Sequence, residues 1–349
     1  MTMLNANVQI ARPTNGPING DVATKNLNMV QALNIALHEQ MNADDSVLIM
    51  GQDVGVDEGV FRVTEGLLKQ FGPKRVVDTP LAEAGIVGTA IGMALYGLRP
   101  VCEIQFSGFT YQAFHQIEQH AARFRNRTRG QLHTPMVIRT PYGGGIRAVE
   151  HHNESREVYY AHTPGLKVVI PSGPRSARAL LNAAIRDPDT IIFYEPKAIY
   201  RAFREAVPNE PEYWEIGKAL TVREGTDVTL ISYGAMMRPT LEAADDLKDL
   251  HNVSAEVIDL LSVSPLDAET IAASVKKTGR AVVVHEGPRH CGIGAEVVAR
   301  CVDNVFDYLE APVQRVAGFD VIFPYFQTEA HYLPDARRVI QAAMKAINY

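Results

Sequence analysis

The fold is decided by the stretch Asp78-Thr79-Pro80-Leu81-Ala82-Glu83-Ala84-Gly85-Ile86-Val87-Gly88. It follows the β-branched pair Val76-Val77 and opens a segment of small and apolar residues. Because Thr79 is a capping residue type and Pro80 suits the first helical position, we expect a helix to begin there. Open α/β sheets bind their ligands at the carboxyl ends of parallel strands. Glu83 therefore occupies a good position for a functional carboxylate, although a carboxylate there also complements the helix dipole.

Outward from this stretch, short apolar runs alternate with helical periodicity, which is typical of a parallel sheet covered by helices. Six runs predict a first, doubly wound α/β domain: Val47–Met50, Val76–Asp78, Val101–Ile104, Met136–Arg139, Val168–Ile170 and Ile191–Tyr194. Four more predict a smaller α/β domain: Val228–Ile231, Val257–Leu260, Ala281–Val284 and Val313–Val316. We predict a flexible tail over residues 1–26, domains over 27–205 and 219–349, and a linker over 206–218.

Composition excludes several classes of protein. The net charge of -6, from 34 basic and 40 acidic residues, argues against nucleic-acid binding, which relies on clustered cations. No apolar run approaches the roughly 20 residues that span a bilayer, and no signal peptide is recognisable. Three cysteines without CxxC spacing indicate neither a disulfide framework nor a structural zinc site, and they suit a reducing cytoplasm.

The predicted helix after Pro80 is rich in small residues. They recur on successive turns: Ala84, Gly85, Gly88, Ala90, Gly92, Ala94 and Gly97. Each glycine costs a helix about 1 kcal/mol relative to alanine, so their number implies that something approaches the helix closely. Packing against another helix, within the chain or across subunits, is a better interpretation than a cofactor site.

A family resemblance extends in order from about Leu27 to the end of the chain. It is carried by Asp78–Gly88, Gly97–Pro100, Glu103–Phe106, His152, His162–Val169, Tyr194–Lys197, Glu256–Leu260 and Ile347–Tyr349. These segments resemble the beta subunit of the thiamine-diphosphate-dependent decarboxylase component of branched-chain 2-oxo acid dehydrogenases (2-oxoisovalerate dehydrogenase). The resemblance implies a pyrimidine-binding α/β domain followed by a domain like the transketolase C-terminal one.

The resemblance also implies roles for individual residues. Glu83 would hydrogen-bond a pyrimidine nitrogen of thiamine diphosphate and favour the tautomer that activates the cofactor, in a dry pocket that raises its pKa. Leu81, Gln105 and Phe109 would line the pyrimidine pocket. Branched-chain relatives commonly carry tyrosine at the position of Phe109, so a hydroxyl hydrogen bond would be lost here.

His152 would lie near the reacting carbon and assist acyl transfer to lipoamide. A zinc site at His151–Glu154 is rejected because no matching ligand set lies nearby. A metalloprotease motif at His285–His290 is rejected because its histidines are five residues apart and Gly-Pro interrupts the helix.

Some relatives bind a monovalent cation, with potassium as the candidate here, through main-chain oxygens. The corresponding positions are Thr134, Met136, Val137, Ala184, Asp187 and Asp189. Backbone ligation leaves little trace in a sequence, so this expectation rests on the resemblance alone.

The Gly-Asp-Gly motif through which thiamine enzymes hold magnesium and the diphosphate is absent from the chain. The resemblance therefore implies that an alpha subunit supplies that half of the site, in an α2β2 heterotetramer. The implied reaction is decarboxylation of a branched-chain 2-oxo acid, with transfer of the acyl group to the lipoyl group of an acyltransferase core. Alternatives are a pyruvate or acetoin dehydrogenase subunit and a non-catalytic assembly subunit. A nicotinamide oxidoreductase is disfavoured because no dinucleotide fingerprint occurs.

Overall fold

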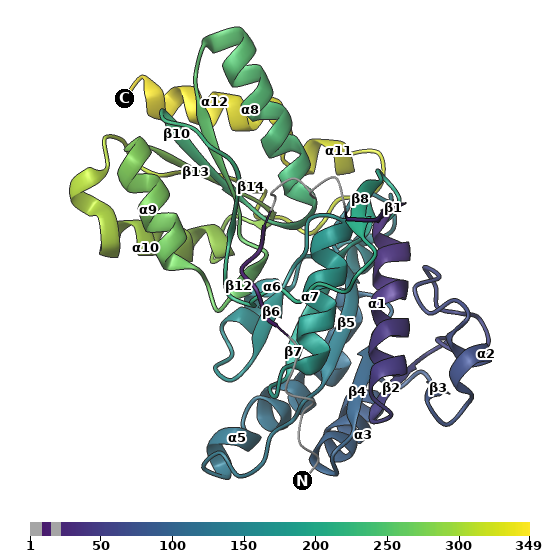
Figure 1. Ribbon diagram of the computed structural model, residues 1–349. Helices are drawn as coiled ribbons and strands as arrows, with labels where there is room; N and C mark the ends of the chain where they lie inside the picture. Colours follow the sequence, from purple (N-terminus) through teal and green to yellow (C-terminus); the bar gives the residue numbers. More distant parts are fainter. Residues whose placement is uncertain (1–8, 15–21) are drawn as a thin grey trace.

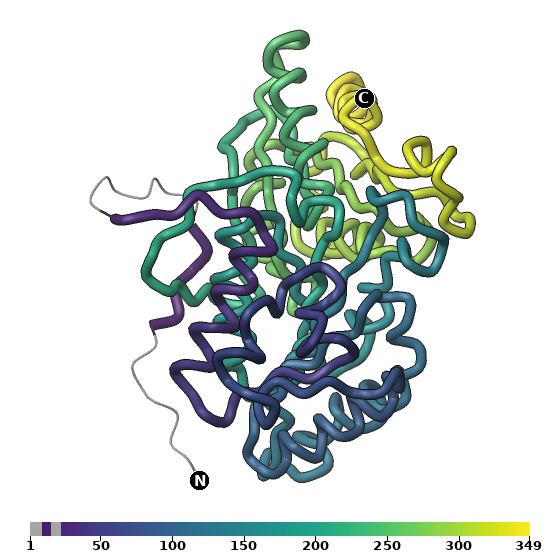
Figure 2. The backbone as a smooth tube through the Cα atoms, turned by 90° about the vertical axis from the view of Figure 1, so that its right-hand side faces the viewer, coloured from purple at the N-terminus to yellow at the C-terminus, as the bar shows by residue number. Residues whose placement is uncertain are grey.

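The computed structural model describes residues 9–14 and 22–349, and most of the predicted tail, residues 1–8 and 15–21, lies outside this range. Two α/β lobes follow each other along the chain (Figures 1 and 2). The first lobe is built on a seven-stranded sheet of order β12-β6-β7-β5-β4-β2-β3. Its strands are β2 (Val47–Gly51), β3 (Val76–Asp78), β4 (Arg99–Glu103), β5 (Val137–Tyr142), β6 (Lys167–Val169), β7 (Ile191–Pro196) and β12 (Ser262–Ser264).

All six strands predicted for this domain are present and pair in parallel. Their continuous apolar runs reflect burial on both faces. Alternate residues of β2 illustrate this, because Val47 and Ile49 join one core cluster whereas Leu48 and Met50 join the other. The prediction of a doubly wound first domain is confirmed.

Helices cover the two faces of this sheet. On one face α1 packs against α7, and on the other face α3 packs against η1. The main helical segments are α1 (Met29–Ala43), α2 (Leu67–Phe71), α3 (Glu83–Leu95), η1 (Ser107–Ala113), α4 (Phe114–Gln116), η2 (Ile117–Ala121), α5 (Phe124–Arg127), η3 (Glu150–His152), α6 (Glu157–Ala161), α7 (Pro174–Arg186) and η4 (Lys197–Ile199). Asn28 begins α1 with a capping box to Gln31, a sequence-local device that fixes the helix start.

The second lobe contains a five-stranded sheet of order β14-β13-β10-β11-β9, and all four predicted strands are present. Its elements are β9 (Leu220–Arg223), β10 (Val228–Ser232), η5 (Gly234–Met236), α8 (Met237–His251), β11 (Ala255–Asp259), α9 (Ala268–Thr278), β13 (Ala281–Pro288), α10 (Ile293–Val305), η6 (Phe306–Tyr308), β14 (Gln314–Gly318), α11 (Glu329–Tyr332) and α12 (Ala336–Ile347). Strand β9 is an antiparallel edge strand, whereas the others pair in parallel.

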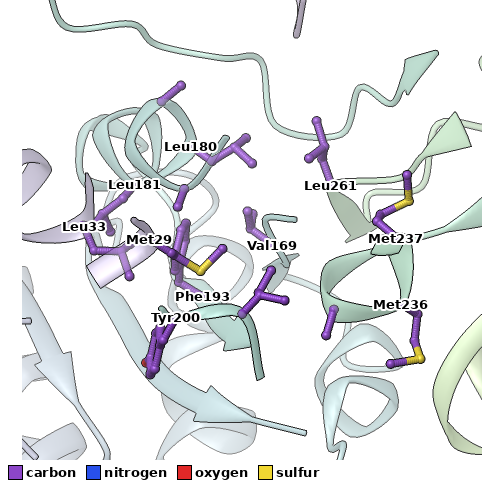
Figure 3. Close-up of a cluster of buried hydrophobic side chains, with 14 of the residues drawn as sticks. Met29, Leu33, Val169, Leu180, Leu181, Phe193, Tyr200, Met236, Met237 and Leu261 are labelled. Atoms are coloured by element: carbon purple, nitrogen blue, oxygen red, sulfur yellow. The ribbon is translucent and has the colours of Figure 1, made fainter. Parts of the chain in front are cut away.

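The two lobes share structure. Strand β12 belongs by sequence to the second lobe but pairs antiparallel with β6 at the edge of the first sheet. Figure 3 shows side chains from both lobes in one buried cluster, with Met236, Met237 and Leu261 alongside Val169 and Phe193. The lobes are therefore packed on each other, not joined only by a linker.

A two-stranded sheet pairs β1 (Thr24–Leu27) with β8 (Glu205–Pro208), and β1 crosses the boundary predicted at residue 26. Ala11, also within the predicted tail, donates its amide proton to the carbonyl of Tyr213 at 2.9 Å. None of the helices in the described ranges is long and apolar enough to cross a membrane.

Candidate functional site

Glu83 is the first residue of α3, three residues later than the predicted helix start. The prediction that Thr79 caps this helix is wrong, because the N-cap is Ala82 and makes no side-chain cap bond. Long-range contacts explain the delay. The Asp78 carboxylate accepts amide protons from Gly55 and Val56 at 2.6 and 3.0 Å, and the Thr79 amide donates to Gly51 at 2.9 Å. These bonds hold residues 78–79 extended against the loop after β2.

The Glu83 carboxylate is half-buried at the N-terminus of α3, beside the carboxyl end of β3. Within the described residues it forms no ion pair or hydrogen bond. A helix N-terminus favours a negative charge. The carboxylate is thus free to bind a ligand.

Aromatic rings gather around His152 on the neighbouring segments. The His152 ring lies edge-on to Phe106, with centroids 4.5 Å apart, and to Phe109 at 5.3 Å. Phe109 lies on η1, which packs against both α3 and η3. Two of the predicted residues, Phe109 and His152, therefore meet directly, and η1 connects them to the helix that carries Glu83.

The imidazole of His152 is held in a neutral-favouring environment. Burial lowers its pKa, and the neighbouring His151 and Lys197 lower it further, against the opposing effect of Glu150. Within the described chain its Nδ1 atom is buried without a hydrogen-bond partner. A buried imidazole nitrogen that lacks a partner is suited to exchange a proton with a ligand.

Gln105 lies just past the end of β4 and donates an amide proton from Nε2 to Asp53 Oδ2 at 2.9 Å. Asp53 has a left-handed backbone with φ 59° in the loop after β2. The sequence alone does not predict a role for Asp53 or Phe106. Phe106 lies just past a predicted strand, which is the available signal, whereas nothing in the sequence marks Asp53.

Leu81 is 71% exposed, and Val56 on the adjacent loop is 79% exposed. Leu81 therefore does not close a pocket within this chain. Apolar side chains left open beside a half-buried carboxylate indicate that this edge of the site is incomplete here.

The predicted cation positions lie elsewhere, near the amino ends of β5 and β7. Several of their groups already have partners. The carbonyl of Thr134 accepts protons from Met136 and Thr190, and Lys167 pairs with Asp187 at 2.6 Å. Asp189 pairs with Arg125 at 2.6 Å. Of the remaining positions, Val137 begins β5 and Ala184 lies in the last turn of α7. No cluster of three or more acidic, histidine or cysteine residues able to hold a metal occurs in residues 9–14 and 22–349.

Comparisons with known proteins agree with this architecture. Residues 25–202 match the pyrimidine binding domain of transketolase, and residues 217–339 match the transketolase C-terminal domain. A solved structure described as a split-gene transketolase, an inactive beta4 tetramer, is similar with a TM-score of 0.76 at 22% identity, covering 93% of this chain and 99% of that one. This likeness confirms the expected α/β fold.

Closer relatives carry two substrate names. The chain is 50% identical over 323 residues to the beta subunit of the pyruvate dehydrogenase E1 component of Bacillus subtilis, covering 93% of this chain and 99% of that protein. It is 49% identical over 324 residues to the 3-methyl-2-oxobutanoate dehydrogenase beta subunit of Mycobacterium tuberculosis, covering 93% of each. These identities over nearly the whole length show that the chain belongs to the family of beta subunits of the E1 components of 2-oxo acid dehydrogenases.

Proposed function

We propose that this chain contributes the pyrimidine-binding half of a thiamine-diphosphate site and acts in oxidative decarboxylation of a 2-oxo acid. The observation that carries the proposal is the Glu83 carboxylate, which has no partner among the described residues and begins α3. This helix packs against η1, and η1 carries Phe109 in contact with Phe106 and His152. These residues fit the pyrimidine ring in kind, since they offer a carboxyl group, aromatic faces and the Gln105 amide. When bound, the cofactor supplies the electron sink for decarboxylation.

Each residue has a distinct task in this proposal. Glu83 exchanges a proton at its carboxyl oxygen with a ring nitrogen, while Phe106 and Phe109 exclude water from the reacting face. His152 holds or delivers a proton at an imidazole nitrogen during acyl transfer to a lipoyl group. Burial lowers its pKa and so favours the neutral imidazole, which can take up a proton and then return it.

We further propose that an alpha-type chain supplies magnesium and the diphosphate-binding half. The absence of Gly-Asp-Gly in the full sequence supports this, and so does the exposure of Leu81 and Val56 at the open edge of the site. An α2β2 heterotetramer in a complex with a lipoyl-bearing acyltransferase core follows from the family. The potassium positions stay a secondary proposal, because the main-chain oxygens of Thr134 and Asp187 already accept hydrogen bonds within the chain. Three free cysteines support a reducing compartment such as the cytoplasm.

The proposed substrate is 2-oxoisovalerate and related branched-chain 2-oxo acids. The segments Glu103–Phe106 and Tyr194–Arg201 favour it by their resemblance to branched-chain members. Pyruvate is the second candidate, because relatives with that name are equally similar in sequence. Few pocket residues set the substrate size, so overall identity does not separate the two.

The test is co-expression of the chain with a partner that carries Gly-Asp-Gly, followed by assays of decarboxylation with thiamine diphosphate and magnesium. We expect activity only in the pair and a higher kcat/KM for 2-oxoisovalerate than for pyruvate. Preference for pyruvate would revise the substrate, and activity of this chain alone would contradict the divided site.

The Glu83→Gln variant tests the carboxylate in the same assay. Loss of proton exchange is expected to lower kcat about 10²–10⁴-fold, the usual contribution of a general acid or base. Glu242→Gln, an exposed change on α8, is the matched control. Full activity of Glu83→Gln would favour the non-catalytic assembly subunit.

A further inference from the structure

A short glycine loop precedes the segment that carries His152. Gly143, Gly144 and Gly145 follow β5, and the chain then continues to η3, which ends at His152. The amide of Gly143 donates to the carbonyl of Glu154 at 3.3 Å and thereby closes the base of a loop over residues 143–154.

Three charged side chains from three other elements hold the three glycines. The Lys197 ammonium donates to the Gly143 carbonyl, the Gly144 amide donates to Glu286, and the Gly145 amide donates to Glu329. Lys197 begins η4, whereas Glu286 lies on β13 and Glu329 begins α11 of the second lobe. The second lobe thus anchors a loop of the first.

Lys197, Glu286 and Glu329, here called the loop anchor, are buried and leave little space around the glycines. The three side chains are 3–4% exposed. Gly144 has so little space that an added Cβ would lie 2.5 Å from Cζ of Phe323. Buried polar side chains cost free energy unless they are hydrogen-bonded, and each of these three makes a hydrogen bond to the backbone of the glycine loop.

Lys197 is also close to His152 through a shared ring. Its Nζ atom lies 6.0 Å from the centroid of Phe106, the ring against which His152 packs. Lys197 can therefore affect the position of the His152 imidazole in two ways. It holds the loop through the Gly143 carbonyl, and it lies beside the Phe106 ring.

We propose that Lys197 is a positioning residue for His152, and that Glu286 and Glu329 complete an anchor through which the second lobe fixes the His152 loop. The inference rests on the proposed function of His152. Fixing the loop would place the imidazole for acyl transfer, and the ammonium charge would favour its neutral form. Other charged or titratable groups at this point are His151 and Glu150 beside His152, and Glu286 and Glu329 beside Lys197. Burial lowers the pKa of Lys197 and raises that of Glu286, as expected for groups held in a dry anchor.

The first experiment measures the stability of the loop in the full chain and does not require an activity assay. Hydrogen exchange of residues 143–154 is measured for the native protein, Lys197→Met, and the exposed control Lys69→Met. We expect faster exchange in this segment for Lys197→Met only. Glu286→Leu should also accelerate exchange, whereas Glu286→Gln keeps an oxygen that accepts the Gly144 amide proton and should not. Unchanged protection in Lys197→Met and Glu286→Leu would overturn the anchor.

The second experiment separates the two half-reactions in the complex with the alpha-type chain. Lys197→Met should lower acyl transfer to a lipoyl domain on the order of 10–100-fold, the cost of a misplaced group, while decarboxylation measured with an artificial electron acceptor changes little. Loss of the ammonium charge should raise the pKa of His152, so the limb of the acyl-transfer pH profile that is absent in His152→Asn should move to higher pH. A purely structural defect would lower both half-reactions and leave the limb in place.

The outcomes for the inference and for the proposed function are distinguishable. If the native pair decarboxylates neither substrate, the proposed function fails, although exchange still tests the anchor. If the native pair is active and Lys197→Met retains normal acyl transfer with an unmoved pH limb, the positioning role is wrong.

Discussion

Arg139 is a fully buried cation in the middle of the central strand β5. It donates to Glu195 at 2.7 Å and to Glu103 at 2.8 Å, and Tyr200 donates to Glu195 as well. The three charged residues come from adjacent strands, β4, β5 and β7, whose parallel register brings them together. Their sequence separation gave no sign of this contact.

Removal of this cation should be costly. Arg139→Met leaves two buried carboxylates close together without a counter-charge, so we expect a loss of about 3–5 kcal/mol in the free energy of unfolding. Urea denaturation of the native protein and the variant measures this loss. The matched control is Arg300→Met on α10, whose partner Glu296 is exposed, and this change should cost about 0.5 kcal/mol or less. Equal losses would contradict the importance of burial.

The buried carboxyl group of Asp259 should make the free energy of unfolding depend on pH. Burial raises its pKa to about 7, although Ser172 and the Leu261 amide donate to its carboxylate. The folded state therefore binds this proton more tightly than the unfolded state, whose carboxyl has an ordinary pKa near 3.8. The contribution of Asp259 to stability is greatest below pH 4 and is lost as the pH rises through 7, by about 4 kcal/mol.

Asp259→Asn should remove this dependence, because asparagine keeps an acceptor oxygen and does not ionise. Relative to the native protein, the variant should gain unfolding free energy at pH 8 compared with pH 5. Urea unfolding at the two pH values measures the difference. A difference between the two proteins that is the same at both pH values would show that Asp259 ionises as readily when folded.

At the scale of elements, the small residues of α3 predict close packing of this helix, but the described chain shows no such packing at the glycines. Its buried face is formed by Ile86, Val87, Ala90, Ile91 and Ala94. The glycines do not approach another backbone within the described chain: an added Cβ at Gly88 would reach only the Gln116 side chain at 3.6 Å, and one at Gly92 would meet nothing within 4 Å. If the predicted close packing exists, it must therefore involve another subunit.

The Gly92→Ala variant tests whether another subunit packs closely against the glycine face of α3. In the isolated chain the change should raise the free energy of unfolding by about 1 kcal/mol, since alanine favours a helix and finds open space here. If another subunit packs closely on this face, the same variant should assemble less well with the alpha-type chain in co-purification. A stabilised variant that assembles normally would mean that the glycines do not serve a subunit contact. Gly97, with φ +99°, is unsuitable as a control because any side chain would be strained there.

At the scale of the whole molecule, the two lobes are joined by more than the segment between them. Strand β12 completes the edge of the first sheet, and the cluster of Figure 3 spans both lobes. Separate unfolding of either lobe would expose this shared surface, so it is disfavoured.

We therefore expect the lobes to unfold together. Fluorescence of Trp214, the chain's single tryptophan, reports on its contact with the α7 region, and the buried Cys301 thiol reports on the second lobe. The two probes should change at the same urea concentration in a chain whose other cysteines are replaced by serine. Two separate midpoints would show that β12 does not couple the lobes.

The ten predicted strands, the two α/β lobes and the family can all be predicted from the amino-acid sequence, because buried parallel strands are continuous apolar runs and local motifs are contiguous residues. The sequence also identified Glu83, Phe109 and His152 as candidates. Only the tertiary structure decided where α3 begins, which loop holds Asp78, and how Lys197, Glu286 and Glu329 meet at Gly143–Gly145. These contacts join residues far apart in the chain, and strand register and lobe packing bring them together, whereas local periodicity carries no record of either.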